Sequence, residues 1–179
     1  MKISLTWKVN KSTHHEVDRF KVKIDDVTLP NGEEKTFSYV QFAKGVCILP
    51  ITNDHQVLCL KQYRHSLGSW QWELPAGAID AEDASPLETA KRELEEETGY
   101  KAEHWLELGS FHPSPGSTSE EIFLFAAAGL TATQQKLESS EQIKLQSVSM
   151  DELKTLISDG EFNHGAGMAA VLRYKFKTD

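Results

Sequence analysis

A run of acidic residues at the end of a well-marked helix constrains this chain more than any other feature. The sequence from Arg92 to Gly99 is RELEEETG. Glu93, Glu96 and Glu97 are spaced i, i+3 and i+4, so their carboxylates project from one side of a helix. Like charges at this spacing repel one another unless a positive group lies between them. Mg²⁺ prefers carboxylate oxygens and often binds substrate phosphates as well, so the pattern favours a magnesium site.

The signals that begin and end this helix are also present. Ser85 is a suitable N-cap, Pro86 fits the first turn, and Glu88 completes a capping box. Gly99 lies where a left-handed residue is expected to end a helix. The residues at helical spacing that predict the buried stripe are Leu87, Ala90, Leu94 and Thr98. Because the three glutamates border this stripe, we favour a binding site over a solvated acidic face, which is the usual meaning of a charge run.

The rest of the chain predicts strands followed by two late helices. The predicted strands cover residues 3–9, 16–27, 36–42, 46–50, 57–62, 105–111, 122–128 and 143–148. Asn31-Gly32 predicts a hairpin turn between the second and the third strand. Ser149 and Glu152 form a second capping box whose helix Gly160 ends, and a last helix covers residues 166–175. Strands around an early helix, followed by late helices, indicate a mixed α/β sandwich.

Composition limits the partners and the location. The chain has 179 residues, 39% of them hydrophobic, which is enough for one globular core, and its net charge of −8 argues against a nucleic-acid binder. No stretch is apolar and long enough to cross a membrane, and the first residues lack the apolar core of a secretory signal. We therefore expect a soluble cytoplasmic protein. Cys47 and Cys59 lie in apolar runs and are predicted to be buried reduced thiols.

The segment from Gly77 to Tyr100 resembles the Nudix box, which reads Gly-x5-Glu-x7-Arg-Glu-U-x-Glu-Glu-x-Gly-U, where U is apolar. The half that begins at Arg92 matches at every position. The first half departs from the pattern, because Gly77 and Arg92 are one residue too far apart. The early glutamate is replaced by Asp83 in register or by Glu82 one residue short. In the family this glutamate supports the loop and pairs with the box arginine, so the departure concerns loop geometry more than catalysis.

The resemblance implies a fold and a division of the chain. We expect an α/β fold, a Nudix-type α/β/α sandwich with a mixed sheet, in residues 43–179. A strand-rich N-terminal extension, residues 1–42, precedes it, and related enzymes use such an extension to form a homodimer.

The resemblance also implies the roles of the box residues. Glu93 and Glu97 would bind Mg²⁺ directly, and Mn²⁺ is an alternative cation. Glu96 would be a direct or water-bridged ligand that also takes part in catalysis, and the backbone carbonyl of Ala76 would add a neutral oxygen. Arg92, counted with the catalytic residues, would anchor the loop and not touch the substrate.

Two further segments resemble the ADP-ribose and nucleoside-diphosphate-sugar pyrophosphatases. One contains KQYR at residues 61–64 and WELPAG at residues 72–77. The other is the loop FHPSPGSTSE at residues 111–120, in which Pro115 lies sixteen residues after Gly99. This resemblance implies Mg²⁺-dependent hydrolysis of the diphosphate bond of ADP-ribose, or of a related nucleoside diphosphate sugar. The products would be a nucleoside monophosphate and a sugar phosphate.

Several side chains outside the box are candidates for substrate binding or catalysis. Arg64 can offer a fork of donors to a diphosphate, or it can be an ordinary surface arginine. Trp70 can stack on a base or belong to the core. Glu120 can position the substrate or only precede a strand. The resemblance implies a loop glutamate that activates the attacking water, with Glu141 as first candidate and Glu138 as second. A hydroxide bound by the cation is the other possible base.

Other functions remain as alternatives. Other Nudix substrates, such as GDP-mannose or dinucleoside polyphosphates, would leave the chemistry unchanged. A non-catalytic domain that senses a nucleotide sugar is disfavoured, because such domains usually lose the box glutamates that this chain keeps. The Pro115-Gly116 loop is less compatible with hydrolysis of oxidised nucleoside triphosphates.

Overall fold

The computed structural model describes residues 6–178 and divides the chain into two compact units. The first unit comprises Met1–Ala43 together with His112–Glu120, and the second comprises Lys44–Phe111 together with Glu121–Asp179. The loop His112–Glu120 joins the first unit through backbone hydrogen bonds. Val40 N donates to Ser117 O at 2.9 Å, and Ser119 N donates to Val40 O at 3.0 Å.

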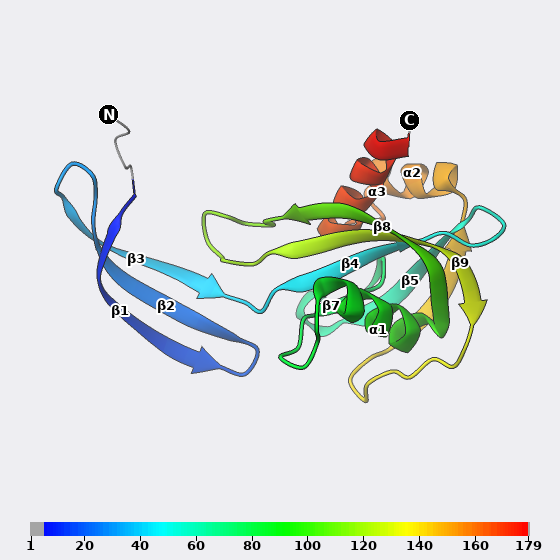
Figure 1. The fold of residues 1–179 in the computed structure, drawn as a ribbon, viewed down its shortest axis with the longest axis horizontal. Helices are drawn as coiled ribbons and strands as arrows, with labels where there is room; N and C mark the ends of the chain where they lie inside the picture. The colour runs from blue at the N-terminus through cyan, green and yellow to red at the C-terminus, as the bar shows by residue number, and fades with distance from the viewer. Residues whose placement is uncertain (1–5, 179) are drawn as a thin grey trace. The chain divides into compact units, whose positions relative to one another are not determined.

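The first unit is an antiparallel sheet of three strands in the order β1-β2-β3 (Figure 1). The strands are β1 (Lys8–Val17), β2 (Phe20–Thr28) and β3 (Glu34–Gln41). All of β1 is exposed, and Val27 and Asp25 of β2 are the buried residues of this unit among those described. This sheet therefore has only a small core of its own.

The strands of this unit differ in part from the sequence prediction. Val17 faces Phe20 across a two-residue turn, so the predicted strand 16–27 is the end of β1 followed by β2. Neither residue of that turn is the glycine or asparagine that favours tight hairpins, which is why the pattern hid it. The predicted strand 3–9 lies partly outside the described residues, and the described strand begins only at Lys8. The predicted turn at Gly32 is confirmed by its left-handed φ of 87°.

The second unit contains two sheets, and helices cover them. One sheet has the order β7-β4-β9-β8 and the other β10-β5-β6. The parallel pairing of β4 with β9 makes the first sheet mixed. The elements of this unit are β4 (Gly45–Pro50), β5 (Val57–Arg64), a 3₁₀ turn (His65–Leu67), β6 (Ser69–Glu73), β7 (Ala76–Ala78), α1 (Pro86–Thr98), β8 (Tyr100–Phe111), β9 (Ile122–Ala132), β10 (Ile143–Val148), α2 (Met150–Ser158) and α3 (Gly165–Thr178).

Helices lie on both faces of the central strand β4, because its side chains alternate between two clusters. Val46 and Ile48 pack with Leu94 of α1, whereas Cys47 and Leu49 pack with residues of α2 and α3. The predicted α/β/α sandwich with a mixed sheet is therefore confirmed. Cys47 and the other cysteine are buried free thiols, as predicted.

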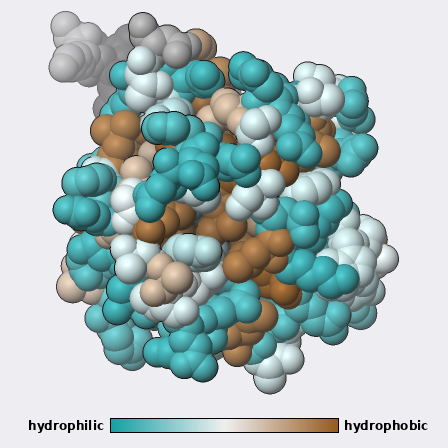
Figure 2. Space-filling view, turned by 90° about the vertical axis from the view of Figure 1, so that its right-hand side faces the viewer, coloured by the Kyte–Doolittle hydropathy of each residue, from teal (hydrophilic) through white to brown (hydrophobic). Residues whose placement is uncertain are grey.

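The remaining differences concern short or exposed strands. Strands β6 and β7 were not predicted as strands, and β7 is only three residues long, too short to show an alternating pattern. Strand β8 begins directly after α1, five residues earlier than predicted, since its first part is polar and exposed. No helix of the described chain is long and apolar enough to cross a membrane. The face drawn in Figure 2 is mainly hydrophilic, with smaller apolar patches between polar side chains.

Candidate active site

The helix α1 forms as its capping signals predict, and this places the acidic residues. The Oγ atom of Ser85 accepts a hydrogen bond from Glu88 N at 3.3 Å, and Gly99 ends the helix with a φ of 69°. The buried residues of α1 are Thr89, Ala90, Leu94, Glu97 and Thr98. The predicted stripe is thus largely confirmed, although one of the glutamates lies within it and not beside it.

Glu97 is the most deeply buried of the three box glutamates, with a relative exposure of 2%. Its Oε2 accepts a hydrogen bond from the backbone N of Ala76 at 2.9 Å, which holds the start of β7 against α1. Burial raises the pKa of Glu97 well above its ordinary value, and the charges of Glu93 and Glu141 raise it further. A buried carboxylate of this kind is stabilised by a cation.

Glu93 occupies space that Gly77 leaves open. A Cβ atom on Gly77 would lie 2.1 Å from Oε1 of Glu93, so any other residue would displace the carboxylate. Burial raises the pKa of Glu93 to about 7, and the charges of Glu96 and Glu141 add to this, although Arg92 opposes it. Gly77 is therefore a positioning residue for Glu93.

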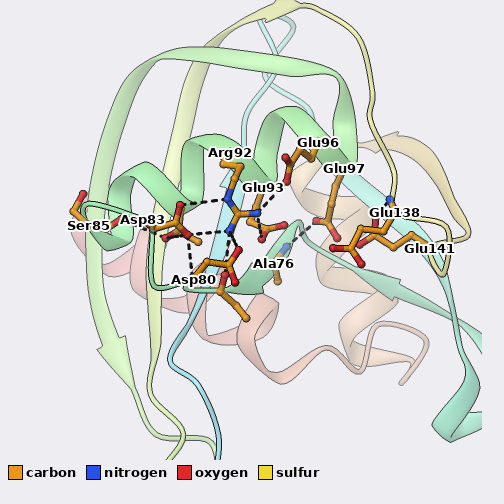
Figure 3. A network of polar contacts seen from close by, with 12 residues as sticks. Ala76, Asp80, Asp83, Ser85, Arg92, Glu93, Glu96, Glu97, Glu138 and Glu141 are labelled. Carbon is orange, nitrogen blue, oxygen red and sulfur yellow. Dashed lines mark hydrogen bonds and ion pairs between the residues drawn. The ribbon is translucent and has the colours of Figure 1, made fainter. Parts of the chain in front are cut away.

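One end of the Arg92 guanidinium bridges two box glutamates (Figure 3). Its NH1 donates to Glu93 Oε1 at 2.8 Å and to Glu96 Oε2 at 3.0 Å. Arg92 and Glu96 keep 30% and 38% of their side chains exposed, so this part of the cluster opens to solvent.

The other end of the same guanidinium holds the loop before α1. Its NH2 lies 3.0 Å from Asp83 Oδ2, 3.3 Å from Asp80 Oδ2 and 3.2 Å from the carbonyl oxygen of Ala78. Asp83, and not Glu82, therefore takes the place of the early glutamate, as one of the two predicted alternatives has it. Asp80 was not predicted as a partner of Arg92. The only signal for it in the sequence is that it is an acidic residue of the same loop.

The loop before β10 brings its two glutamates to the same site. The backbone N of Glu138 donates to Glu141 Oε2 at 2.8 Å, which orients that carboxylate. Figure 3 shows Glu141 pointing toward Glu97, and its charge raises the pKa of Glu97 and of Glu93. The structure therefore brings Glu141 together with the box glutamates, although they lie far apart in the sequence.

Arg64 forms a two-point ion pair with the buried carboxylate of Glu73. Its Nε lies 2.8 Å from Glu73 Oε1, and its NH2 lies 2.5 Å from Oε2. The hydrogen bond with Glu73 raises the pKa of Arg64, and the charges of Glu97 and Glu141 raise it further, so the arginine lies within electrostatic range of the acidic cluster. Glu73 was not predicted as a site residue, and the signal for it was its place in the WELPAG run.

Trp70 lies on the opposite face of its sheet from Arg64. Arg64 is opposite Ser69 in the β5–β6 register and Trp70 is opposite Tyr63, and neighbouring residues of a strand point to opposite faces. Trp70 is 41% exposed, and the ammonium of Lys144 lies 4.7 Å from the centre of its ring. The register therefore does not bring Trp70 and Arg64 together.

Glu120, the third residue predicted to bind substrate, belongs to the first unit. Its backbone oxygen lies 2.8 Å from Nδ1 of His112, so it ends a closed loop. Partial burial raises the pKa of Glu120 above its ordinary value.

The oxygen donors around α1 fit a hard divalent cation. Glu93 and Glu97 project from α1 on the side of Ala76, and Glu96 lies beside Arg92 (Figure 3). Carboxylate and carbonyl oxygens are the ligands that Mg²⁺ prefers. Within residues 6–178, no three acidic, histidine or cysteine side chains are gathered closely enough to hold an ion in this conformation. Arg92 occupies oxygens of Glu93 and Glu96 instead.

Comparison with known proteins places this site in a family. The model of the NUDIX domain matches residues 41–170. The chain is 37% identical over 141 residues to the methanol dehydrogenase activator of Bacillus methanolicus, which covers 78% of this chain and 76% of the relative. It is 31% identical over 153 residues to the ADP-ribose pyrophosphatase of Bacillus subtilis, covering 84% and 82%. A crystal structure of an ADP compounds hydrolase shares the fold, with a TM-score of 0.86, 22% identity and coverage of 97% and 95%. The chain therefore belongs to the Nudix hydrolase family.

Proposed function

We propose that the protein hydrolyses the diphosphate bond of ADP-ribose or of a related nucleoside diphosphate sugar, with Mg²⁺ as cofactor. The products are a nucleoside monophosphate, AMP for ADP-ribose, and a sugar phosphate. The observation that carries this proposal is the convergence of Glu93, Glu97 and Glu141 from two distant segments on one site. The relative named ADP-ribose pyrophosphatase supports the substrate class.

The box residues hold the cation in this proposal. Glu93 and Glu97 supply carboxylate oxygens, Ala76 supplies its carbonyl oxygen, and Glu96 binds directly or through water. The bound cation, Mg²⁺ or Mn²⁺, supplies positive charge that stabilises the negative charge of the phosphoryl group in the transition state. Arg92 keeps the loop before α1 in place through Asp83.

The remaining residues activate water and bind the substrate. Glu141 accepts the proton of the attacking water, and the backbone N–H of Glu138 keeps its carboxylate oriented. Arg64 lies within electrostatic range of the acidic cluster and binds a diphosphate oxygen, while Glu73 holds its guanidinium. Roles in substrate binding for Trp70 and Glu120 stay predictions. The strands of residues 1–42 are proposed to form a homodimer, and the location is proposed to be cytoplasmic.

A substrate panel tests the proposal. Purified protein is incubated with ADP-ribose, ADP-glucose, GDP-mannose or a dinucleoside polyphosphate, with Mg²⁺, with Mn²⁺ or with EDTA, and release of the nucleoside monophosphate is measured. We expect release from ADP-ribose that EDTA abolishes and that Glu97→Gln reduces by about a thousandfold or more. Cleavage of GDP-mannose alone would contradict the substrate, and full turnover of Glu97→Gln would contradict the metal site.

The two loop glutamates form a matched pair for testing the base. Glu141→Gln removes the proposed proton acceptor, so we expect kcat to fall by about a hundredfold or more with KM little changed. Glu138→Gln keeps the backbone N–H that orients Glu141, so we expect a much smaller effect. A reversed order of the two effects would move the base to Glu138.

A second candidate function follows from the relative at 37% identity, whose name is methanol dehydrogenase activator. The second proposal is that this protein stimulates the activity of a methanol dehydrogenase. The test adds the purified protein to a methanol dehydrogenase assay, with the Glu97→Gln variant beside it. Stimulation by the wild type alone would tie activation to the hydrolytic site, and no stimulation would remove this candidate.

A further inference from the structure

The position of Arg92 raises the question of how a cation reaches its ligands. Of the three box glutamates, Glu93 and Glu96 share one guanidinium nitrogen, NH1 of Arg92. Glu97 is held by the backbone N of Ala76 instead. A cation that binds Glu93 and Glu96 must therefore compete with a positive group that already occupies oxygens of both.

We propose that Arg92 is a built-in counter-cation that a divalent metal ion displaces from Glu93 and Glu96 when it binds. In the metal-free protein, NH1 of Arg92 keeps the two carboxylates together. The metal ion then replaces NH1 as the positive partner of these two carboxylates, while the rest of the guanidinium stays in place. This inference rests on the proposed function, because it concerns the same metal site.

The geometry allows the exchange without loss of the arginine's position. A guanidinium has five N–H donors in a rigid plane, and those of Arg92 are divided between two ends. NH2 contacts Asp83, Asp80 and the carbonyl of Ala78, so these bonds hold the guanidinium after NH1 is released. The exchange therefore breaks the two bonds at NH1 and preserves the anchor of the loop.

The charges around Arg92 favour the exchange. Four carboxylates, those of Asp80, Asp83, Glu93 and Glu96, lie within 3.3 Å of one guanidinium. One guanidinium cannot balance four carboxylates, so the cluster keeps an attraction for a further cation. The exposure of Glu96, at 38% of its side chain, gives an ion access from solvent.

Competition has a measurable consequence. If Arg92 occupies ligand oxygens in the metal-free state, part of the free energy of metal binding is used to displace it. Removal of the guanidinium should then tighten metal binding, although it destabilises the metal-free protein. A residue that only helps to build the metal site would have the opposite effect on affinity.

The test compares Arg92→Gln with the wild type by titration calorimetry with Mg²⁺ and with Mn²⁺ alone, and by thermal melting in EDTA and in saturating Mg²⁺. We expect the Kd for the ion to fall by about fivefold or more. We also expect a lower Tm in EDTA and a larger increase of Tm on addition of Mg²⁺. Unchanged or weaker ion binding by the variant would overturn the proposal.

Two further variants separate the local exchange from other effects. Lys91→Gln removes the same charge from the next residue, which pairs with Glu88 at 2.7 Å and not with the cluster, and its Kd should stay at the wild-type value. An equal gain in affinity there would mean that net charge alone acts, which overturns the proposal.

Arg92→Lys keeps the charge but loses the planar fork of donors, so it should also bind the ion more tightly than the wild type. It replaces Arg92→Gln in the test if that variant does not fold. Absence of ion binding by the wild type would remove the proposed function together with this inference, whereas binding without the Arg92 effect would remove the inference alone.

Discussion

Arg64 and Arg92 both bind carboxylates at this site, but Arg64 belongs to a balanced ion pair and Arg92 to a cluster with an excess of carboxylates. Among the described residues, Arg64 has one carboxylate partner, Glu73, and the two make a two-point pair in which the carboxylate is 7% exposed. Arg92 has four carboxylate partners in the same part of the chain, Asp80, Asp83, Glu93 and Glu96.

The difference lies in the balance of charge. The pair of Arg64 and Glu73 is neutral, and a planar fork of donors satisfies both carboxylate oxygens. The cluster around Arg92 keeps an excess of negative charge, and Glu97 adds a further buried carboxylate nearby. A balanced pair stabilises the fold around it, whereas an unbalanced cluster attracts a cation.

Among the changes that test this comparison, the largest effect is expected from moving one carboxylate of the unbalanced cluster without changing its charge. Gly77→Ala places a Cβ atom only 2.1 Å from Oε1 of Glu93, so the carboxylate must move. A displacement of about 1 Å can reduce turnover by about a hundredfold, so we expect a loss of kcat of that order. The measurement is steady-state hydrolysis of ADP-ribose in saturating Mg²⁺.

Gly165→Ala is the matched control for this change. Nothing lies within 4 Å of a Cβ atom on Gly165, and its backbone does not have a positive φ. Its activity should equal that of the wild type. If Gly77→Ala were as active as Gly165→Ala, the tight contact with Glu93 would not matter for function.

An intermediate effect is expected from breaking the balanced pair. Glu73→Gln leaves the guanidinium of Arg64 without its charged partner, so we expect the free energy of unfolding to fall by roughly 1–3 kcal/mol. Urea denaturation measures it. Glu88→Gln, which removes an exposed partner of Lys91, should change the same quantity by less than about 0.5 kcal/mol. Equal effects of the two variants would show that the burial of Glu73 does not increase the contribution of its ion pair to the free energy of unfolding.

The smallest effect is expected from removing one carboxylate partner of Arg92, Asp83. This effect on the free energy of unfolding depends on pH. The hydrogen bond from Arg92 lowers the pKa of Asp83 from 3.8 to about 2. A carboxyl group with a lowered pKa stabilises the fold above its unfolded-state pKa, and this contribution disappears as the pH falls through the folded-state value. Asp83→Asn should therefore cost at most about 1 kcal/mol of unfolding free energy at neutral pH.

The pH series sharpens this prediction. The difference in unfolding free energy between wild type and Asp83→Asn should be constant above about pH 4 and shrink between about pH 4 and pH 2. Denaturation at several pH values measures it. A difference that persists unchanged to pH 2 would mean that the ionised form of Asp83 does not matter.

Local signals in the sequence predicted many of the helices and strands of the second unit. The cap at Ser85 and the glycine at Gly99 set the limits of α1, and β10 has the predicted bounds. Weak or absent local signals explain the misses. The turn between β1 and β2 lacks the glycine or asparagine that favours tight hairpins, and the three residues of β7 form a strand only because they pair with β4.

The same division applies to the site. The spacing of Glu93, Glu96 and Glu97 follows from helical geometry, so the sequence alone places them on one side of α1. The choice of Asp83 over Glu82 depended on the path of a loop whose length departs from the family pattern. The placing of Trp70 away from Arg64 depended on the strand register, which local sequence does not set.

What the sequence by itself determined is the set of acidic groups on one helix, because the five residues from Glu93 to Glu97 have their spacing fixed by helical geometry. What only the tertiary structure decided is which distant groups join them. Glu141 points toward Glu97 although more than forty residues separate them in the sequence, and Leu74 N donates to His164 Nδ1 across ninety residues. Contacts of this kind depend on how sheets and loops pack, and packing is a property of the whole chain that no short pattern contains.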